Sequence, residues 1–480
     1  MTKRRRLIDF ARFEVDHSRY TPDQKKNAKP IYASRIERAV KAGGAIYINN
    51  AVIEGNLTLV SLVVKNRIHI EDSEIRGIVK ASYAQFKDLV KFKNSQFKSE
   101  VVFNSATFEK DLILDSGRFE GKELDFRYIL VKQALRCPKS EFINGTADFS
   151  SAQVGATIDF RSSLFWKKGV FDGCKVKGNA SFDEAVFHQK EASFIGARIE
   201  GKASFRRAWF EEASFSFCKF ETDSDFAEAT FVRKFNLQGA STSSCPFFQH
   251  WTRFGTNATI DLRGCTYDTC DLIHDKHDHD SIDDKYHQWK ELMKSMKRLD
   301  PKDNTQPFTQ LEQTFRKAGE DQLANKVYYK GRRRESSSIR LLWPPQHFLA
   351  WPLDRFLFLT TGYGVRLGRL LLWTILAVLV GTCVFRARGA VVPQKDSQAV
   401  STLGPYCEED SVCSLKWQES LWFSLRTFLP VEIPSGSEWK PSSQILLWIL
   451  TFSGFASILK LIGWIFVPVG VAGLAGWLKR

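Results

Sequence analysis

One short stretch holds the only group of side chains in this sequence whose types suit a metal ion. It comprises Cys265, Cys270, His274, His277 and His279, with aspartates between the histidines. Thiolates and imidazoles are the usual zinc ligands, but structural zinc sites space them in characteristic ways. This spacing matches no closed zinc pattern. We therefore favour a solvated, Asp- and His-rich loop and keep the five residues as metal-ligand candidates.

No other segment suggests a catalytic or cofactor site. The sequence contains no Gly-rich phosphate loop, no nucleophile elbow and no dinucleotide fingerprint. The part that precedes the apolar C-terminal segments also lacks a paired redox cysteine motif. We therefore predict a non-enzymatic protein that needs no cofactor.

A second kind of chemistry, ion conduction, is suggested by Thr360-Thr361-Gly362-Tyr363-Gly364. This pentapeptide is similar to the potassium-channel filter, in which backbone carbonyls replace the water around the ion. A filter lies between two membrane spans, whereas this segment precedes the first apolar run. We therefore expect an interfacial turn here.

The segment 420–434 does lie between the two apolar runs. It resembles the pore helix and loop of two-span potassium channels in Trp422-Phe423-Ser424 and in Thr427. The pore-loop candidates that the resemblance implies are Thr427, Leu429, Pro430, Val431 and Glu432. The filter's Gly-Tyr-Gly is replaced by Leu429-Pro430-Val431-Glu432-Ile433-Pro434, so a ladder of carbonyls is not expected. We favour a non-conducting, re-entrant or interfacial segment over a pore.

The first apolar run, Leu370 to Phe385, contains no charged residue and is flanked by Arg369 and Arg386. Sixteen residues of helix are about 24 Å long, which spans a bilayer when the flanking arginines snorkel to its surfaces. We predict a transmembrane helix at 370–386, preceded by an interfacial segment at 341–369.

The second apolar run, residues 445–478, is interrupted only by Lys460 and is longer than one crossing needs. We read Ile445–Leu459 as a leading part that is tilted or lies in the interface. Leu461–Leu478 then forms the main crossing, bent near Pro468.

The orientation of the spans follows from the two regions that flank them. The N-terminus carries charge but no apolar h-region, so nothing in it would export the leading domain. The loop at 387–443 contains Cys407 and Cys413, a pair that fits a small disulfide in an oxidising compartment. We therefore predict a multi-pass protein of a bacterial inner membrane, with both termini in the cytosol and this loop outside.

The net charge of +15 is concentrated near the membrane segments and at the N-terminus. Residues 1–44 carry 12 basic and 5 acidic side chains, whereas residues 45–240 carry 28 and 26. A near-neutral region is a poor match for phosphate backbones, so a nucleic-acid partner is not expected. The arginines at 332–334 precede the first span and indicate contact with the lipid bilayer.

Residues 45–240 are built from one repeating pattern. An apolar residue recurs about every 11 residues, and a second one follows it by 5. Of the seventeen intervals between first-slot residues, thirteen are 11, three are 12 and one is 10, a regularity typical of repeat architectures. The first slot holds Ile48, Leu59, Ile70, Ala81, Phe92, Phe103, Leu114, Phe126, Cys137, Phe149, Phe160, Phe171, Phe182, Phe194, Phe205, Phe215, Phe226 and Leu237. The second holds Ile53, Val64, Ile75, Phe86, Phe97, Phe108, Phe119, Val131, Phe142, Val154, Phe165, Val176, Phe187, Ile199, Phe210, Phe220 and Phe231.

A small residue lies two positions before many of these, as in Ala203-Ser204-Phe205 and Ala208-Trp209-Phe210. In an extended chain these two side chains share a face, so both point inward. Cys137, Cys174 and Cys218 occupy inward positions too, and we expect them to be buried and inert.

These units resemble the pentapeptide-repeat family, in which a small residue, a polar residue and a central Leu or Phe are followed by two polar positions. Ala203-Ser204-Phe205-Arg206-Arg207 matches this unit position for position. The resemblance implies a mainly β fold, a right-handed quadrilateral β-helix of about nine coils. Residues 1–44 then form a basic segment with an N-terminal cap at 31–41, where Ile36, Ala39 and Val40 are spaced as on a helix.

After Leu237 the period fails, and we expect a connector at 241–340 that is irregular at first, with a helix near 286–299. Residues 307–334 are similar to one tetratricopeptide-type helix pair. Its two stripes, separated by Gly319, are Phe308, Leu311 and Phe315, and then Leu323, Ala324, Val327 and Tyr328.

We expect a membrane-anchored protein whose β-helix faces bind an unidentified protein partner, as a binding, scaffold or sensing module. The alternative is an ion-channel-like protein, including a membrane-permeabilising effector, that is gated through the β-helix. A pore would require a homo-oligomer formed through the transmembrane region.

Overall fold

The computed structural model describes residues 12–18, 29–244, 252–255, 258–269, 305–338, 350–363, 365–393, 414–430, 439–447 and 450–474. The chain forms two compact units, residues 1–324 and 325–480, and each is described by itself.

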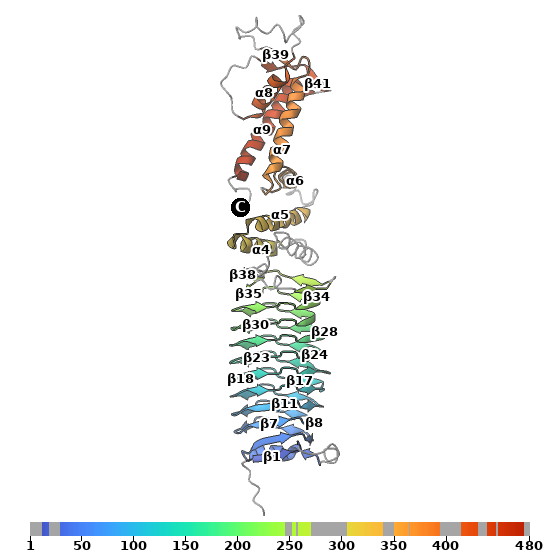
Figure 1. The fold of residues 1–480 in the computed structure, drawn as a ribbon, viewed down its shortest axis with the longest axis vertical. Coiled ribbons are helices and arrows are strands. Elements are labelled where there is room, and N and C mark those ends of the chain that lie inside the picture. Colours follow the sequence, from blue (N-terminus) through green and yellow to red (C-terminus); the bar gives the residue numbers. More distant parts are fainter. Residues whose placement is uncertain are drawn as a thin grey trace, which may run out of the picture. The chain divides into compact units, whose positions relative to one another are not determined.

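The first unit is a β-solenoid whose strands pair in parallel with the strands one coil away (Figure 1). Each coil contributes four short strands, and register partners are 22 or 23 residues apart in most coils, as for Ile48 and Ile70 or Phe119 and Phe142. Two of the four faces are separate ten-stranded sheets, and the other two join into one sheet of 18 strands. The quadrilateral, mainly β fold predicted from the repeat is therefore confirmed.

The strand bounds follow the faces. The first ten-stranded sheet contains β1 (Arg12–Asp16), β3 (Ala45–Asn49), β7 (Ile68–Glu71), β11 (Val90–Lys93), β15 (Leu112–Ile113), β19 (Leu135–Arg136), β23 (Ile158–Asp159), β27 (Ala180–Ser181), β30 (Ala203–Ser204) and β33 (Ser224–Asp225). The second contains β6 (Val63–Val64), β10 (Gln85–Phe86), β14 (Thr107–Phe108), β18 (Leu130–Val131), β22 (Gln153–Val154), β26 (Lys175–Val176), β29 (Arg198–Ile199), β32 (Lys219–Phe220), β35 (Ser241–Ser244) and β38 (Thr266–Thr269).

The 18-stranded sheet covers the remaining two faces. It contains β2 (Ile31–Tyr32), β4 (Val52–Glu54), β5 (Leu57–Thr58), β8 (Glu74–Ile75), β9 (Val79–Lys80), β12 (Gln96–Phe97), β13 (Val101–Val102), β16 (Arg118–Phe119), β17 (Glu123–Asp125), β20 (Glu141–Phe142), β21 (Thr146–Asp148), β24 (Leu164–Phe165), β25 (Gly169–Val170), β28 (Val186–Ser193), β31 (Trp209–Ser214), β34 (Thr230–Asn236), β36 (Arg253–Phe254) and β37 (Thr259–Asp261).

The interior is filled by the residues of both predicted slots, every one of which is buried. Phenylalanines at equivalent positions of successive coils stack with ring centroids 4.5–5.7 Å apart. The longest such ladder consists of Phe97, Phe119, Phe142, Phe165, Phe187, Phe210, Phe231 and Phe254. This core accounts for more than half of the chain's 39 phenylalanines.

A turn follows each first-slot residue, and its third residue has positive φ. The N–H of Ala106, for example, donates to the carbonyl of Phe103 over 2.9 Å, and Ser105 between them has a φ of 57°. Positive φ at this position is the mark of a type II turn and is easiest for glycine. Most coils place another residue there, such as Tyr83, Tyr128 or Lys139, with φ between 47° and 60°.

The solenoid is longer than the repeat pattern predicted. Residues 241–269 were expected to be irregular, but β35, β37 and β38 continue the sheets, and Phe254 continues the phenylalanine ladder. At the other end β1 pairs with β3 ahead of the predicted start at residue 45. Two sheets therefore have ten strands rather than the nine expected from nine coils. The helix expected near 286–299 lies outside the described residues.

A helix covers each end of the solenoid. The predicted N-terminal cap is α2 (Ala33–Lys41), which buries Ile36, Ala39 and Val40. At the other end α4 (Gln306–Lys317) bonds to the last coil: the Gln306 amide joins Gly264 N and Cys265 O, and Gln310 Nε2 donates to Tyr267 O over 2.8 Å. Both helices occupy ends where unpaired strand edges would otherwise invite further strands.

The two helices predicted within 307–334 are present as α4 and α5 (Asp321–Ser338), with Gly319 at a φ of 77° between them. Further along lie α6 (Ala350–Thr360), α7 (Leu367–Phe385), α8 (Trp417–Phe428) and α9 (Phe452–Leu474). Two antiparallel strand pairs accompany them, β39 (Val391–Pro393) with β40 (Trp439–Pro441) and β41 (Ile445–Leu447) with β42 (Leu450–Thr451).

Two helices of the described chain are long and apolar enough to cross a membrane, over Gly368–Phe385 and Phe452–Ala472. The first agrees with the predicted span. The predicted division of the second at Lys460 is wrong, because one helix runs through Lys460 and Pro468. Its start is set by Thr451, whose hydroxyl accepts the N–H of Gly454, while Ile445–Leu447 belongs to a strand pair.

The stacked core generates a prediction about two aromatic residues two positions apart. Phe126 is fully buried between Phe103 and Phe149, whereas Tyr128 is 60% exposed at the turn. We expect Phe126→Ala to lower the free energy of unfolding by about 3–5 kcal/mol, because it leaves a cavity. Tyr128→Ala should change it by less than about 1 kcal/mol. Urea unfolding followed by circular dichroism of the β-sheet signal measures both, and equal losses would contradict the ladder as the main source of stability.

Candidate functional site

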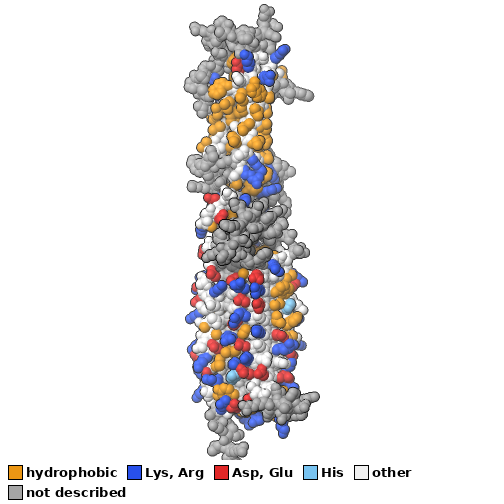
Figure 2. All heavy atoms as spheres, in the orientation of Figure 1, with side chains coloured by type: hydrophobic (Ala, Val, Ile, Leu, Met, Phe, Trp, Pro, Cys, Tyr) orange, Lys and Arg blue, Asp and Glu red, His pale blue; other side chains and the backbone are white. Residues whose placement is uncertain are grey.

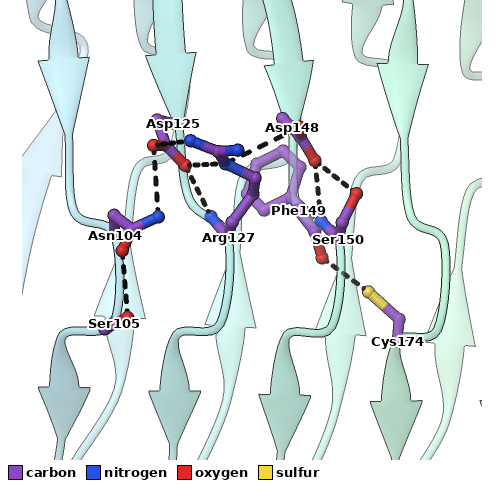
Figure 3. A network of polar contacts seen from close by, with 8 residues as sticks. All are labelled: Asn104, Ser105, Asp125, Arg127, Asp148, Phe149, Ser150 and Cys174. Carbon is purple, nitrogen blue, oxygen red and sulfur yellow. Dashed lines mark hydrogen bonds and ion pairs between the residues drawn. The ribbon is translucent and has the colours of Figure 1, made fainter.

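Charged side chains on the outside of the solenoid join neighbouring coils (Figure 3). Arg127 donates through Nε and Nη2 to the two carboxylate oxygens of Asp125, at 2.9 and 2.8 Å. Asp125 also accepts from the Arg127 backbone N–H and from Asn104 one coil away, at 3.0 and 3.3 Å. On the other side, Arg127 Nε lies 3.9 Å from Asp148.

The same Asp-x-Arg fork recurs at Asp159 with Arg161 and at Asp261 with Arg263. Burial raises the pKa of the Asp125 carboxyl, but the hydrogen bonds and charge of Arg127 bring it below its ordinary value overall. A carboxylate held ionised by a bidentate arginine is a poor proton donor or acceptor at neutral pH. These forks therefore serve as clamps on the turns and offer no catalytic group.

The thiols of the solenoid are equally unreactive. Cys137, Cys174 and Cys218 are buried and free, as predicted. Burial raises the pKa of the Cys174 thiol to about 12, and its Sγ donates to the carbonyl of Phe149 over 2.9 Å. Since the thiolate is the reactive form, such thiols are inert.

Of the five metal-ligand candidates, the structure describes only Cys265. Cys265 is 1% exposed inside the last coil, and burial raises its pKa to about 12. Its side chain therefore faces the core rather than a solvated loop, which is a correction. Cys270, His274, His277 and His279 lie outside the described residues. Among the residues described, no group of three or more His, Cys, Asp or Glu side chains is placed to hold a metal ion.

An aromatic column lies on the outside of the solenoid and was not predicted. His188 stacks on Trp166 with ring centroids 4.7 Å apart, and Trp209 lies 5.2 Å from His188 on its other side. Trp166 is 40% exposed. The signal was present in the sequence, because the three residues are spaced by one coil, but the two inward slots alone do not select outward positions.

In the second unit α8 packs between α7 and α9 and supplies Phe428 to their shared apolar core. Ser424 and Thr382 both donate to the carbonyl of Val378, each over 2.8 Å. Close approach is possible because α7 has Gly381 beside Ser424 and α9 has Gly463 beside the Phe428 carbonyl; a Cβ at either glycine would overlap these atoms.

The pore-loop candidates fall at the end of α8. Thr427 uses its hydroxyl within the helix, donating to Phe423 O over 2.7 Å, and Leu429 ends the helix in an extended conformation. Pro430 follows in a bend, while Val431 and Glu432 lie outside the described residues, as do Cys407 and Cys413. The described residues thus contain a helix where the pore helix was predicted and do not test the loop or the disulfide.

The filter-like segment begins at the end of α6 with Thr360 and continues as a turn through Tyr363, whereas Gly364 lies outside the described residues. Gly362 and Tyr363 have φ values of 55° and 58°. Tyr363 is buried and donates from Oη to Asp354 over 3.3 Å. A turn was predicted here, although its position in a membrane interface stays a prediction.

Comparison with known proteins supports the repeat and nothing finer. A family model described as "Pentapeptide repeats (9 copies)" matches residues 166–209 and 189–230. No curated protein and no solved structure matches the chain. The chain therefore contains pentapeptide repeats within its solenoid, and the likeness to potassium channels finds no support in these comparisons.

The clamps on the turns generate a pH-dependent prediction. The pKa of Asp125 is lowered in the fold, so its contribution to stability is complete above its unfolded pKa, near 4, and is lost as the pH falls through the lowered value. Asp125→Asn should reduce the free energy of unfolding by roughly 1–3 kcal/mol at pH 7, and the reduction should become smaller as the pH falls below about 4.

Asp115 is the matched control. Burial raises its pKa, Arg136 opposes this and Asp159 adds to it, so ionised Asp115 destabilises the fold. Asp115→Asn should therefore stabilise the solenoid at pH 7, with the gain disappearing below about pH 4. The urea midpoints of both variants at pH 7 and pH 3 test these two effects. Destabilisation by both substitutions at pH 7 would contradict the opposite roles assigned to Asp125 and Asp115.

The tight packing of α8 generates a third prediction. Gly463→Ala places a methyl group on the Phe428 carbonyl, so we expect α8 to be displaced and the second unit to lose about 1–3 kcal/mol of stability. Gly470→Ala, on the same helix, meets only the flexible end of Leu370 at 3.3 Å and should be tolerated. Thermal unfolding of both variants in detergent tests the packing, and equal melting temperatures would rule it out.

Proposed function

We propose that this chain is a membrane-anchored, non-enzymatic binding protein of a bacterial inner membrane. In this proposal α7 and α9 cross the bilayer with both chain termini in the cytosol. The solenoid presents a rigid surface to a protein partner, as a scaffold or sensor.

The observation that carries the binding role is the aromatic column of Trp166, His188 and Trp209. Exposure of the apolar surface of tryptophan to water is unfavourable, and tryptophan is enriched at protein interfaces, where that surface becomes buried. The many arginine and glutamate side chains of the solenoid are engaged in pairs between coils, such as Arg118 with Glu141 and Arg207 with Glu228. Ring contacts on both sides of His188 restrain the column, so it would lose little side-chain entropy on binding.

The support for membrane attachment is the apolar surface of α7 and α9 (Figure 2). On α7, Leu371, Leu372 and Ile375 are more than half exposed, and on α9 so are Leu461, Trp464 and Val471. Apolar surface of this extent is unfavourable in water, at about 25 cal/mol per Å², and is satisfied by lipid.

The support for a role other than catalysis comes from the polar groups themselves. The carboxylates of Asp125 and Asp159 have lowered pKa values beside Arg127 and Arg161, and the solenoid's buried thiols, such as Cys174, have raised ones. Both arrangements favour a structural use of these side chains.

A second candidate, ion conduction, is favoured by one observation. The short helix α8 lies between two long apolar helices and packs against both, which is the relation of a pore helix to its spans. Conduction would require several copies around a shared axis, with the segment after Leu429 facing that axis.

The binding role is tested by photo-crosslinking in living cells. A photoreactive amino acid at position 166 of the full-length protein should give a discrete adduct, because the partner covers the aromatic column. The same residue at position 83 should not, although Tyr83 is 63% exposed, since it lies at a turn away from the column. Trp209→Ala should weaken the adduct at position 166 severalfold.

Ion flux from vesicles that contain the purified protein separates the two candidates. We expect no flux. Flux that changes with Pro430→Gly or Glu432→Gln, together with no adduct at position 166, would refute the binding role and establish the pore.

A further inference from the structure

The N-terminal end of α7 adjoins a cluster of aromatic rings contributed by three segments of the second unit. Tyr329 of α5 lies 6.2 Å from Phe358 of α6 and 6.2 Å from Tyr363 in the following turn. Phe358 and Tyr363 are 6.0 Å apart, which closes the triangle. The cluster thus ties α5, α6 and the start of α7 together.

Three arginines are held against this cluster. The Arg366 guanidinium lies 4.7 Å from the centre of the Tyr329 ring, and that of Arg333 lies 6.0 Å from the centre of Phe358. Arg369 Nη1 donates to the carbonyl of Phe358 over 3.4 Å. Cation–π contact positions a guanidinium without neutralising it, so the hydrogen-bonding edges of Arg333 and Arg366 stay available.

No carboxylate among the described residues forms an ion pair with these three arginines. The described stretches between 325 and 393 contain two acidic residues. Glu335 pairs with Arg332 at 2.8 Å, and Asp354 accepts from Tyr363. The arginines of the solenoid differ, because Arg127, Arg161 and Arg263 each form an ion pair with an aspartate two residues earlier. Within the part of the chain that the structure describes, the arginines beside α7 therefore form a positive site with no carboxylate partner.

The site lies where the apolar part of α7 begins. Arg366, Arg369 and Trp373 follow one another at helical spacing, and Trp373 Nε1 donates to Leu359 O over 3.3 Å. Tryptophan and arginine at the start of a span are typical of the headgroup layer. No side chain caps the N-terminus of α7 and its first turn has no acidic residue, so the helix dipole adds to the attraction for an anion. Figure 2 shows basic side chains at the α6 end of the apolar band over α7–α9.

We propose that Arg333 and Arg366, supported by Arg369, bind the headgroup phosphate of an acidic phospholipid such as phosphatidylglycerol. Guanidinium groups bind phosphate oxygens in pairs, and Leu371 and Leu372 of α7 offer an apolar surface to the acyl chains. A lipid phosphate shared by Arg333 of α5 and Arg366, the residue before α7, would couple the segment that leads into the membrane to the span itself. The site rests on the proposed membrane attachment and adds a specific lipid to it.

The test uses full-length protein reconstituted into phosphatidylcholine vesicles, with or without phosphatidylglycerol. Extraction at alkaline pH reports insertion, and co-purifying lipid, measured by native mass spectrometry after detergent exchange, reports selection. We expect insertion in both vesicles and a preference of at least tenfold for phosphatidylglycerol. The preference should fall about fivefold in Arg366→Gln and disappear in Arg333→Gln/Arg366→Gln, with insertion unchanged. Arg366→Lys, which keeps the charge but not the fork, should lose less than Arg366→Gln.

The matched control is Arg386→Gln/Arg388→Gln, which removes the same charge from exposed positions at the other end of α7. It should keep the full preference. An equal loss in this control, or a loss below twofold in Arg333→Gln/Arg366→Gln, would overturn the lipid site while leaving membrane attachment intact. Displacement of the lipid by millimolar inorganic phosphate alone would overturn it in favour of a free-phosphate site. Wild-type protein that fails to insert in either vesicle would contradict the proposed membrane attachment itself.

Discussion

The stacking of inward phenylalanines on their equivalents one coil away is the interaction on which the rest of the solenoid depends. Hydrogen-bonded strands lie about 4.8 Å apart, which is also a favourable spacing for offset-stacked rings. The ring centroids of Phe97 and Phe119, for example, are 4.7 Å apart. The spacing between strands that forms the backbone hydrogen bonds is therefore also the spacing at which the rings stack. Aliphatic residues fill the same slots in other coils, as in the register-paired series Val131, Val154, Val176 and Ile199.

This constraint determines where function can lie. Because side chains fill the interior, every group available to a partner must be on the outside or at the ends. Many charged side chains on the outside form ion pairs with side chains one coil away, such as Arg118 with Glu141 and Arg207 with Glu228. Arg127 and Arg161 each bind the aspartate two residues earlier, at turns whose third residue has positive φ. The column of Trp166, His188 and Trp209 differs from them, since its rings contact each other and leave an apolar edge in solvent. That contrast is why we assign the binding surface to it.

In the second unit, arginines and hydroxyl side chains make different contacts from those in the solenoid. Its arginines near α7 are positioned by aromatic rings and a backbone carbonyl rather than by carboxylates, which leaves their charge unneutralised. Its hydroxyls at Ser424 and Thr382 donate to a helix carbonyl, as buried hydroxyls must when water is absent. Small residues at Gly381 and Gly463 allow this packing. Both observations suit a lipid environment, with the charge at its boundary and the hydroxyl contacts within it.

The sequence by itself determined every feature that depends on local periodicity. The inward slots, the small residues before them and the buried cysteines followed from an 11-residue period, and α4, α5 and α7 followed from apolar spacing. Tertiary structure decided what depends on partners far apart in the chain. The strands β35 to β38 continue the solenoid because each finds a strand to pair with, although the residues after Leu237 have lost the period. The start of α9 depends on a strand pair and a threonine cap, not on where the apolar run begins. The arginines beside α7 come from two segments more than 30 residues apart, and only folding brings them to one cluster of rings.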